Sequence, residues 1–207
     1  MSNTIGMACN LHCEVHALPG LIKNAEEFFD DIVFISSPPA GVEHDEESCQ
    51  IIKDAGHRLV LSSVDRGFGV LRTRCIRESK ADWVMIMDAD ERVFCEVPRM
   101  TCEGTEGYPE FKNPKLTIRT SGMVNQRQAI RDFLNAKAAG ADAVRLKRRH
   151  WFQSPESTQW TPCQNFDLIP DYQLRFVRNS PYVFYNPDER MHEKILDSRT
   201  WSEPRWV

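Results

Sequence analysis

The 207-residue chain has no apolar run as long as the roughly 18 to 20 residues that a helix needs to cross a bilayer. Its first residues, MSNTIGMACN, lack the charged and apolar regions of a signal peptide. Internal repeats and low-complexity segments are also missing. Since 41% of the residues are hydrophobic, the chain can bury an ordinary core. We therefore expect a single-domain cytoplasmic protein without a transmembrane segment.

An excess of positive charge is missing too. Lys and Arg number 26 against 30 Asp and Glu, so the formal net charge is -4. This balance gives no general attraction for nucleic acid or an anionic membrane surface, and we predict no nucleic-acid partner. One small basic cluster, KRRH at 147–150 with Arg145, has no wider basic surface around it. We interpret it as a solvated strand end or as a contact for an anionic acceptor.

The seven cysteines do not form the pattern of a disulfide framework. Their number is odd and they are scattered through predicted strands and helices, which favours reduced thiols. Cys9, His12, Cys13 and His16 lie three or four residues apart, a spacing that would put all four on one helical face. Such sets can bind zinc, but structural zinc sites normally draw ligand pairs from separated segments, so we do not predict a zinc site.

Strand and helix signals alternate in the first half of the chain. Strands are predicted at 3–9, 31–36, 58–63 and 83–87, and helices at 15–28, 45–55 and 70–79. This alternation predicts a parallel sheet that is covered by helices on both faces.

The second half of the chain has a different pattern. Residues 96–122 are rich in Pro and Gly and show little periodicity, which predicts a long loop. A helix at 125–139 is followed by predicted strands at 143–150, 172–179 and 182–186. We expect these strands to form a mixed or antiparallel addition to the sheet.

The strand at 83–87 ends in two carboxylates, Asp88 and Asp90. In open α/β sheets ligands bind at the carboxyl ends of strands, and two acidic side chains there can hold a divalent cation against a phosphate. The alternative is an acidic turn that only ends the strand, because short acidic motifs often occur by chance.

The order of motifs resembles the family-2 inverting glycosyltransferases of the GT-A fold, particularly the bacterial lipopolysaccharide core-type β-glucosyltransferases. The matching segments are CEVHALP with Glu14, DDIVFISS, GFGVLRTR with Arg72, Asp88 to Glu91, IPDYQLRFVRN at 169–179 and RMHEKI at 190–195. The resemblance implies an α/β GT-A fold, a mostly parallel sheet flanked by helices with a smaller mixed or antiparallel C-terminal part. It also implies a nucleotide-binding half, 1–95, and an acceptor-side half, 96–207.

The same resemblance implies a hexosyltransferase that transfers a sugar from a nucleoside-diphosphate sugar to a hydroxyl acceptor with inversion. Mn²⁺ or Mg²⁺ would stabilise the charge that develops on the departing diphosphate. We predict Asp90 as a metal ligand. The resemblance implies that Asp88 contacts the ribose, or the metal through water, and that His192 is a second metal ligand.

Other residues that the resemblance assigns to the site have simpler alternatives. Arg72 would face the diphosphate, or it pairs on the helix surface with Glu78 or another carboxylate. His192 is otherwise a surface histidine beside Glu189 or Glu193.

An inverting transfer also needs a general base for the acceptor hydroxyl. Asp171 is the candidate, although an Asp after Pro170 also favours a turn. Arg175 would align Asp171 or contact the diphosphate, or it is a strand residue paired across the sheet. Trp151 and Trp160 are candidates for stacking on a sugar ring, or are core residues.

The predicted donor site departs from the family pattern at the second strand. That strand usually ends in an aspartate that reads the base, whereas Ser36 stands here. A serine can hydrogen-bond a uracil or thymine edge, which favours a UDP- or dTDP-linked donor. Glu14 and Ser36 complete the predicted donor-binding set, and the expected acceptor is a glycan or a lipid-linked glycan.

Two other function classes remain open from the sequence. A phosphohydrolase of the haloacid dehalogenase type also places Asp-X-Asp after an apolar strand, but near the start of the domain and followed by Thr or Val, where Arg92 stands here. The other class is a non-catalytic GT-A module that binds a sugar nucleotide or a partner.

Overall fold

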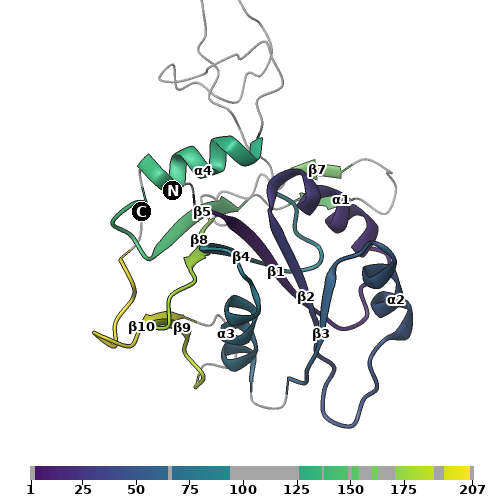
Figure 1. Ribbon diagram of the computed structural model, residues 1–207. Helices are drawn as coiled ribbons and strands as arrows, with labels where there is room; N and C mark the ends of the chain where they lie inside the picture. Colours follow the sequence, from purple (N-terminus) through teal and green to yellow (C-terminus); the bar gives the residue numbers. More distant parts are fainter. Residues whose placement is uncertain are drawn as a thin grey trace, which may run out of the picture.

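A six-stranded sheet forms the centre of the computed structural model (Figure 1). The structure describes residues 3–64, 67–93, 126–136, 138–148, 151–153, 160–162, 171–188 and 194–205. The sheet contains β1 (Ile5–Leu11), β2 (Asp31–Ser36), β3 (Arg58–Leu61), β4 (Trp83–Met87), β5 (Ala143–Arg148) and β8 (Asp171–Arg178). The helices are α1 (Leu18–Phe28), α2 (Glu46–Asp54), α3 (Phe68–Glu78) and α4 (Gln126–Ala136).

The strand order is β3-β2-β1-β4-β8-β5. The first four strands of the chain pair in parallel, whereas β8 lies antiparallel between β4 and β5. The predicted mostly parallel sheet with an antiparallel C-terminal addition is therefore confirmed. The strands β2 and β3 lie on one side of β1, and β4 lies on the other side. The carboxyl ends of β1 and β4 therefore form the topological switch point of the sheet.

Two short strand pairs are not predicted as pairs by the sequence. A pair of strands outside the main sheet consists of β9 (Val183–Tyr185) and β10 (Ile195–Asp197), and a second pair of β6 (Trp151–Gln153) and β7 (Trp160–Pro162). The sequence predicts only the first of these four strands, at 182–186. Strands of three residues carry too little alternation to be recognised in a sequence.

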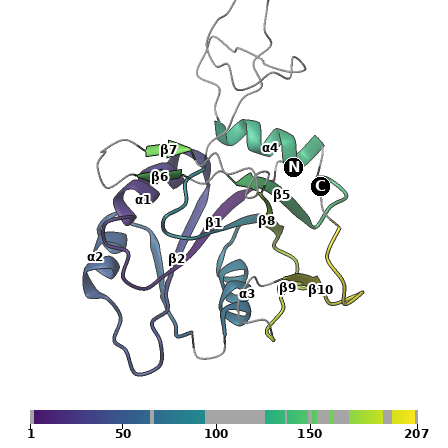
Figure 2. The same ribbon diagram turned by 180° about the vertical axis from the view of Figure 1, so that it is seen from behind.

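Both faces of the sheet are covered, as the alternation of strands and helices predicts (Figures 1 and 2). One core lies between the sheet and α1, α2 and α4, and contains Leu21, Phe28, Phe34 and Trp83. The other core lies between the sheet and α3 with the β9–β10 pair. Successive strand residues enter opposite cores, since side chains alternate across a sheet.

The helix boundaries follow from local chemistry. The predicted helix at 15–28 begins only at Leu18, because the carbonyl of Glu14 accepts hydrogen bonds from the backbone amides of Ala17 (2.9 Å) and Leu18 (3.1 Å) in a preceding turn. At the start of α2 the Asp45 carboxylate accepts a hydrogen bond from the amide of Ser48 (3.0 Å). This capping contact with Ser48 holds the pKa of Asp45 below its ordinary value.

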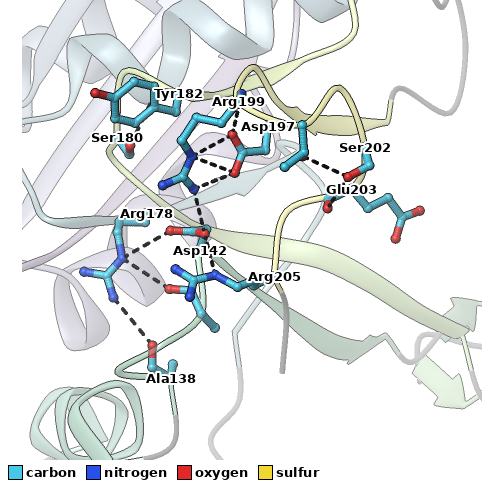
Figure 3. A network of polar contacts seen from close by, with 12 residues as sticks. Ala138, Asp142, Arg178, Ser180, Tyr182, Asp197, Arg199, Ser202, Glu203 and Arg205 are labelled. Atoms are coloured by element: carbon cyan, nitrogen blue, oxygen red, sulfur yellow. Dashed lines mark hydrogen bonds and ion pairs between the residues drawn. The ribbon is translucent and has the colours of Figure 1, made fainter.

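The C-terminal segment, which carries β9 and β10, is bound to the edge of the sheet opposite the carboxyl end of β4. Figure 3 shows the polar contacts that bind it there. Asp142 is buried and accepts hydrogen bonds from Arg199 (3.2 Å) and Arg205 (3.3 Å). Arg178 at the end of β8 forms a third ion pair with the same carboxylate, at 4.0 Å. Asp197 binds the guanidinium of Arg199 from the other side. These contacts around Asp142 fix the end of the C-terminal segment that contains Arg199 and Arg205.

The same segment approaches α3 closely at its other end. The backbone amide of Tyr185 donates a hydrogen bond to the hydroxyl of Thr73 (2.9 Å), which in turn donates to the carbonyl of Gly69 (2.9 Å). A Cβ atom at Gly69 would lie 2.1 Å from the carbonyl oxygen of Asn186, so only glycine allows this approach. No helix in the described parts of the chain is long and apolar enough to cross a membrane.

We expect Gly69→Ala to lower the free energy of unfolding by roughly 1 to 3 kcal/mol, because the added methyl group forces α3 and the chain at Asn186 apart. Urea denaturation followed by circular dichroism measures the change. Gly140→Ala is the matched control: nothing lies within 4 Å of a Cβ at that position, so its effect should stay within about 0.5 kcal/mol. Equal effects of the two substitutions would contradict the packing of β9 against α3.

Candidate functional site

The carboxyl ends of β1, β2 and β4 meet at one edge of the sheet. Glu14 follows β1, Ser36 ends β2, and Asp88 and Asp90 follow β4. The structure brings Asp88 together with two of the other predicted residues, Arg72 from α3 and Arg175 from β8. We call Arg72, Asp88, Glu91 and Arg175 the charge cluster.

The chain turns sharply after β4. The amide of Glu91 donates a hydrogen bond to the carbonyl of Asp88 (3.0 Å), and the amide of Asp88 donates to the Glu91 carboxylate (3.0 Å). This reciprocal pattern resembles a capping box, in which an acidic side chain three residues on satisfies a backbone amide. Glu91 therefore closes the turn that carries Asp88 and Asp90. The Asp-X-X-Glu spacing in the sequence is the signal for this function of Glu91.

Arg175 holds the turn from the neighbouring strand. Its side chain is only 8% exposed, and its guanidinium contacts the carboxylates of Glu91 (2.5 Å) and Asp88 (3.5 Å). It also donates a hydrogen bond to the carbonyl of Ile86 in β4 (3.4 Å). A buried cation is costly unless carboxylates compensate it, so these contacts join β8 firmly to the end of β4. Arg175 is therefore a strand residue that pairs with the carboxylates of the turn after the neighbouring strand.

Arg72 approaches the same carboxylate from the helix side. Its guanidinium donates a hydrogen bond to Asp88 (3.1 Å), and its Cζ atom lies 5.9 Å from the centre of the Tyr185 ring. Glu78, the alternative partner considered from the sequence, binds Arg74 instead (3.2 Å). Asp88 therefore lies between two guanidinium groups, one from each side.

Protonated groups lie beneath the charge cluster. Burial raises the pKa of Tyr185 to about 12, although the positive charge of Arg72 opposes the shift. Burial also raises the pKa of the Cys75 thiol to about 12 and that of Cys9 well above its ordinary value. These three groups stay neutral near pH 7, so neither buried cysteine supplies a thiolate nucleophile.

Asp90 differs from Asp88 in its surroundings. It is exposed at the tip of the turn, and its carboxylate has no hydrogen-bond or ion-pair partner among the described residues. The side chain of Arg92 donates hydrogen bonds to the carbonyls of Ala17 (2.9 Å) and Ala89 (3.0 Å) and makes no hydrogen bond to Asp90. The turn thus presents one restrained carboxylate and one free carboxylate to the same edge.

The free carboxylate of Asp90 suits a metal that is shared with a ligand. In the described parts of the chain no three His, Cys, Asp or Glu side chains cluster as a complete set of metal ligands. A complete set is unnecessary for Mg²⁺, which proteins commonly bind through one or two carboxylates together with substrate phosphates and water. Asp90 fits that incomplete type of site.

Glu14 and Ser36 make hydrogen bonds within the protein. The Glu14 carboxylate accepts a hydrogen bond from the amide of His12 (2.6 Å) and shapes the loop after β1. The buried Ser36 hydroxyl shares a hydrogen bond of 2.8 Å with His44 Nδ1. Both residues therefore order the loops at the edge of the sheet, beside the end of β1.

Asp171 is the first residue of β8. Because β8 runs antiparallel to β4, its first residue lies at the edge where β4 ends. The backbone thus places Asp171 on the same edge as Asp88, and the Asp171 side chain lies outside the described residues. Trp151 and Trp160 begin the paired strands β6 and β7, whose side chains also lie outside the described residues.

His192 lies outside the described residues, so its predicted position near Asp90 stays a prediction. The flanking chain is described on both sides, where the amide of Asn186 donates a hydrogen bond to the carbonyl of Lys194 (2.7 Å). The carbonyl of Pro187 faces Gly67, which precedes α3, the helix that carries Arg72.

Two alternatives that the sequence leaves open do not match the structure. Cys9 is buried within β1, Cys13 is exposed, and α1 begins only at Leu18, so Cys9, His12, Cys13 and His16 do not share a helical face. The acidic pair of the haloacid dehalogenase type follows a strand near the start of the domain, whereas Asp88 here follows the fourth strand.

Comparisons with known proteins give matches among solved structures alone. No protein-family model matches the sequence, and no curated protein matches it. S. aureus TarS aligns with 99% of this chain at 9% identity and a TM-score of 0.51. Mannosyltransferase PcManGT from Pyrobaculum calidifontis, in complex with GDP-Man and Mn²⁺, aligns with 44% at 16% identity and a TM-score of 0.35. This chain spans 36% of TarS and 28% of PcManGT.

The fold is of the GT-A type, as the resemblance of the motifs implies. At 9% identity, the likeness to TarS shows the fold alone. The narrower resemblance to lipopolysaccharide core-type β-glucosyltransferases stays a prediction.

The charge cluster gives a direct stability test. We expect Glu91→Ala to lower the free energy of unfolding by about 3 kcal/mol, because it opens the turn and removes a carboxylate from the buried Arg175. Urea denaturation measures the loss. Asp90→Ala, on the same turn, is the matched control and should change stability by no more than about 0.5 kcal/mol, since its carboxylate is exposed. A Glu91→Ala variant as stable as Asp90→Ala would show that the turn does not depend on Glu91.

Proposed function

We propose that this chain is a glycosyltransferase domain that transfers a hexosyl group from a nucleoside-diphosphate sugar to a hydroxyl acceptor, with inversion and with Mn²⁺ or Mg²⁺. One observation carries the proposal: the turn after β4 presents the free carboxylate of Asp90 beside Asp88, which is held between Arg72 and Arg175. Carboxylates and guanidinium groups at one strand end suit a metal-bound diphosphate. The GT-A fold supports this reading.

In this proposal Asp90 holds the metal, with oxygen atoms of the diphosphate and water as the remaining ligands. His192 is proposed as a second protein ligand. When bound, the metal would neutralise the charge that develops on the leaving diphosphate. Asp88 keeps a fixed orientation because two cations hold it, which suits a contact to the ribose or to metal-bound water.

Arg72 supplies positive charge on the α3 side of the site. Its position is set from both directions, by Asp88 through a hydrogen bond and by the ring of Tyr185. An arginine that is already oriented loses less side-chain entropy when it binds a phosphate. We therefore assign Arg72 to the diphosphate, and Arg175 to positioning the turn that carries Asp90.

Asp171 is proposed as the general base that removes the proton from the acceptor hydroxyl. Inversion needs this base on the opposite face of the sugar from the leaving diphosphate. The start of β8 lies at the same sheet edge as the metal-binding turn but on the next strand, so the two functions come from separate elements. The proposed division into a nucleotide-binding half, 1–95, and an acceptor-side half, 96–207, agrees with these assignments.

The loops after β1 and β2 are assigned to the nucleoside of the donor. Ser36, fixed by His44, offers a neutral hydroxyl where a carboxylate would otherwise read the base, which favours a uridine or thymidine nucleotide. A glycan or a lipid-linked glycan is the proposed acceptor.

Asp90→Ala should abolish metal-dependent nucleotide binding while the fold stays intact. A native-state ligand raises the melting temperature by mass action, so the experiment is a thermal-shift series with UDP-, dTDP- and GDP-sugars, each with MnCl₂ or with EDTA. The wild type should show a shift that requires Mn²⁺, and Asp90→Ala should show none.

Glu27→Ala, which removes an exposed carboxylate on α1, serves as the control and should behave as the wild type. If Asp90→Ala binds donor and Mn²⁺ as tightly as the wild type, the metal assignment is wrong. Donor binding by the wild type without any transfer or donor hydrolysis would instead indicate a non-catalytic module.

Asp171→Asn should lower kcat by roughly 10²- to 10⁴-fold, because the amide cannot accept the proton of the acceptor hydroxyl. Donor affinity should stay close to that of the wild type, since Asp171 is not assigned to the donor. The measurement is release of nucleoside diphosphate with and without acceptor, once a donor has been found by thermal shift. An unchanged kcat would move the function of general base to another residue.

A further inference from the structure

Aromatic side chains gather on the face of the β9–β10 pair that points away from the core. Tyr185 faces the core that α3 covers, so Phe184 and its partner Leu196 face the other way. Tyr182, one residue before β9, is 48% exposed, and Trp201, in the turn after β10, is 73% exposed. We call Tyr182, Phe184 and Trp201 the aromatic patch.

The rings of the aromatic patch are held in place by their neighbours. The guanidinium of Arg199 lies 5.0 Å from the centre of the Tyr182 ring (Figure 3). Arg199 is itself fixed by a hydrogen bond to the carboxylate of Asp197 (2.9 Å). The rings of Phe184 and Trp201 meet edge to face, with their centres 5.9 Å apart. Rings that are already ordered lose little side-chain entropy when they bind a ligand.

The backbone of Trp201 has an uncommon conformation. Its φ angle is 55°, and among the described residues it is the one non-glycine residue with a positive φ. This conformation is costly for a bulky side chain, and such strain is found mainly at functional positions. The amide of Trp201 donates a hydrogen bond to the carbonyl of Asp197 (2.7 Å), and the amide of Asp197 donates to that of Ser202 (2.9 Å). The turn is therefore held in a strained form that exposes an indole ring.

The exposed area is too small for a stable protein interface. A large aromatic side chain buries 150–250 Å², so Trp201 and Tyr182 together expose roughly 300 Å² at their observed exposures. Stable interfaces bury about 800 Å² on each partner. The area instead suits a ligand the size of a few small rings.

The charged groups beside the aromatic patch are paired within the protein. Arg199 and Arg205 donate hydrogen bonds to the carboxylate of Asp142, at 3.2 Å and 3.3 Å. The carboxylate of Glu203 accepts a hydrogen bond from Arg145 (3.1 Å). Because these charges compensate one another, the surface favours a neutral ligand over a phosphate or an anionic membrane.

Hydroxyl groups border the same rings. Thr200 and Ser202 are exposed, and their hydroxyls share a hydrogen bond of 2.9 Å. The hydroxyl of Ser180 accepts a hydrogen bond from the amide of Tyr182 (3.4 Å). A hydroxyl can donate and accept at once, so each can bind a further polar group. A sugar ring complements this surface, because its C–H groups form an apolar face and its hydroxyls project from the edge.

We infer that the aromatic patch binds a neutral oligosaccharide, with Trp201 and Tyr182 stacked on the apolar faces of sugar rings. The site is separate from the charge cluster. The amide of Asn179, just before the patch, donates a hydrogen bond to the carbonyl of Asp82, which precedes β4, whereas Asp88 follows β4 (2.8 Å for the hydrogen bond). Binding at the patch goes beyond the proposed transfer reaction and requires neither donor nor metal.

The test is saturation-transfer NMR with maltohexaose, cellohexaose and chitohexaose, without nucleotide or metal. The wild type should bind at least one of them. In Trp201→Asn the affinity should fall roughly three- to tenfold, as expected when one stacked ring is lost. Asn tolerates the left-handed conformation, so this variant should fold. Phe133→Ala, which removes an exposed ring on α4, is the matched control and should bind as the wild type.

Tyr182→Ala is a second variant with the same expected loss, and decides the question if Trp201→Asn does not fold. The inference is overturned if the wild type binds none of the three hexasaccharides, or if both variants bind as the wild type. A wild-type dimer in sedimentation analysis that Trp201→Asn dissociates would also overturn it, because a second copy would then cover the patch.

The failure of this inference is distinguishable from failure of the proposed function. Trp201→Asn should keep the Mn²⁺-dependent thermal shift with sugar nucleotides, because the patch is not assigned to the donor. Asp90→Ala should bind the hexasaccharide as the wild type does. If Asp90→Ala lost hexasaccharide binding and Trp201→Asn kept it, the sugar would bind at the charge cluster and the inference would be wrong.

Discussion

The site depends above all on the compensation of one buried cation. The guanidinium of Arg175 lies under the end of β4, where only carboxylates can offset its lost hydration. Glu91 and Asp88 supply them, and Glu91 at the same time closes the turn through the amide of Asp88. This turn sets the position of Asp90. The need to compensate the buried charge of Arg175 therefore determines where the carboxylate of Asp90 faces solvent.

The second support of the site comes from the C-terminal segment. Tyr185 lies against Arg72 because β9 is fastened to α3 through Thr73 and the close approach at Gly69. At the opposite edge of the sheet, Asp142 holds the end of the same segment through Arg199 and Arg205, and also pairs with Arg178 of β8, as Figure 3 shows. The segment therefore links the contacts around Asp142 at one edge of the sheet to the position of Arg72 at the other edge.

The sequence predicts the main strands and helices because each is long enough to show several repeats of its hydrophobic pattern. It also placed Asp88 and Asp90 correctly at the end of β4, since a strand end can be read from the change of an apolar run into acidic residues. It missed β6, β7 and β10, which have three residues each and therefore no recognisable period. The boundaries between β1 and α1 also differ from the prediction, because β1 continues to Leu11 and a turn precedes α1.

The sequence by itself determined the order of strands and helices, the parallel arrangement, and the strand end on which the carboxylates lie, because these depend on local periodicity and on the chirality of the connections. Only the tertiary structure decided which charges meet. Arg72 pairs with Asp88 rather than with Glu78, and Arg175 with Glu91, because the packing of α3 and β8 against β4 brings them within reach. Several carboxylates are available to each arginine in the sequence, and burial selects among them.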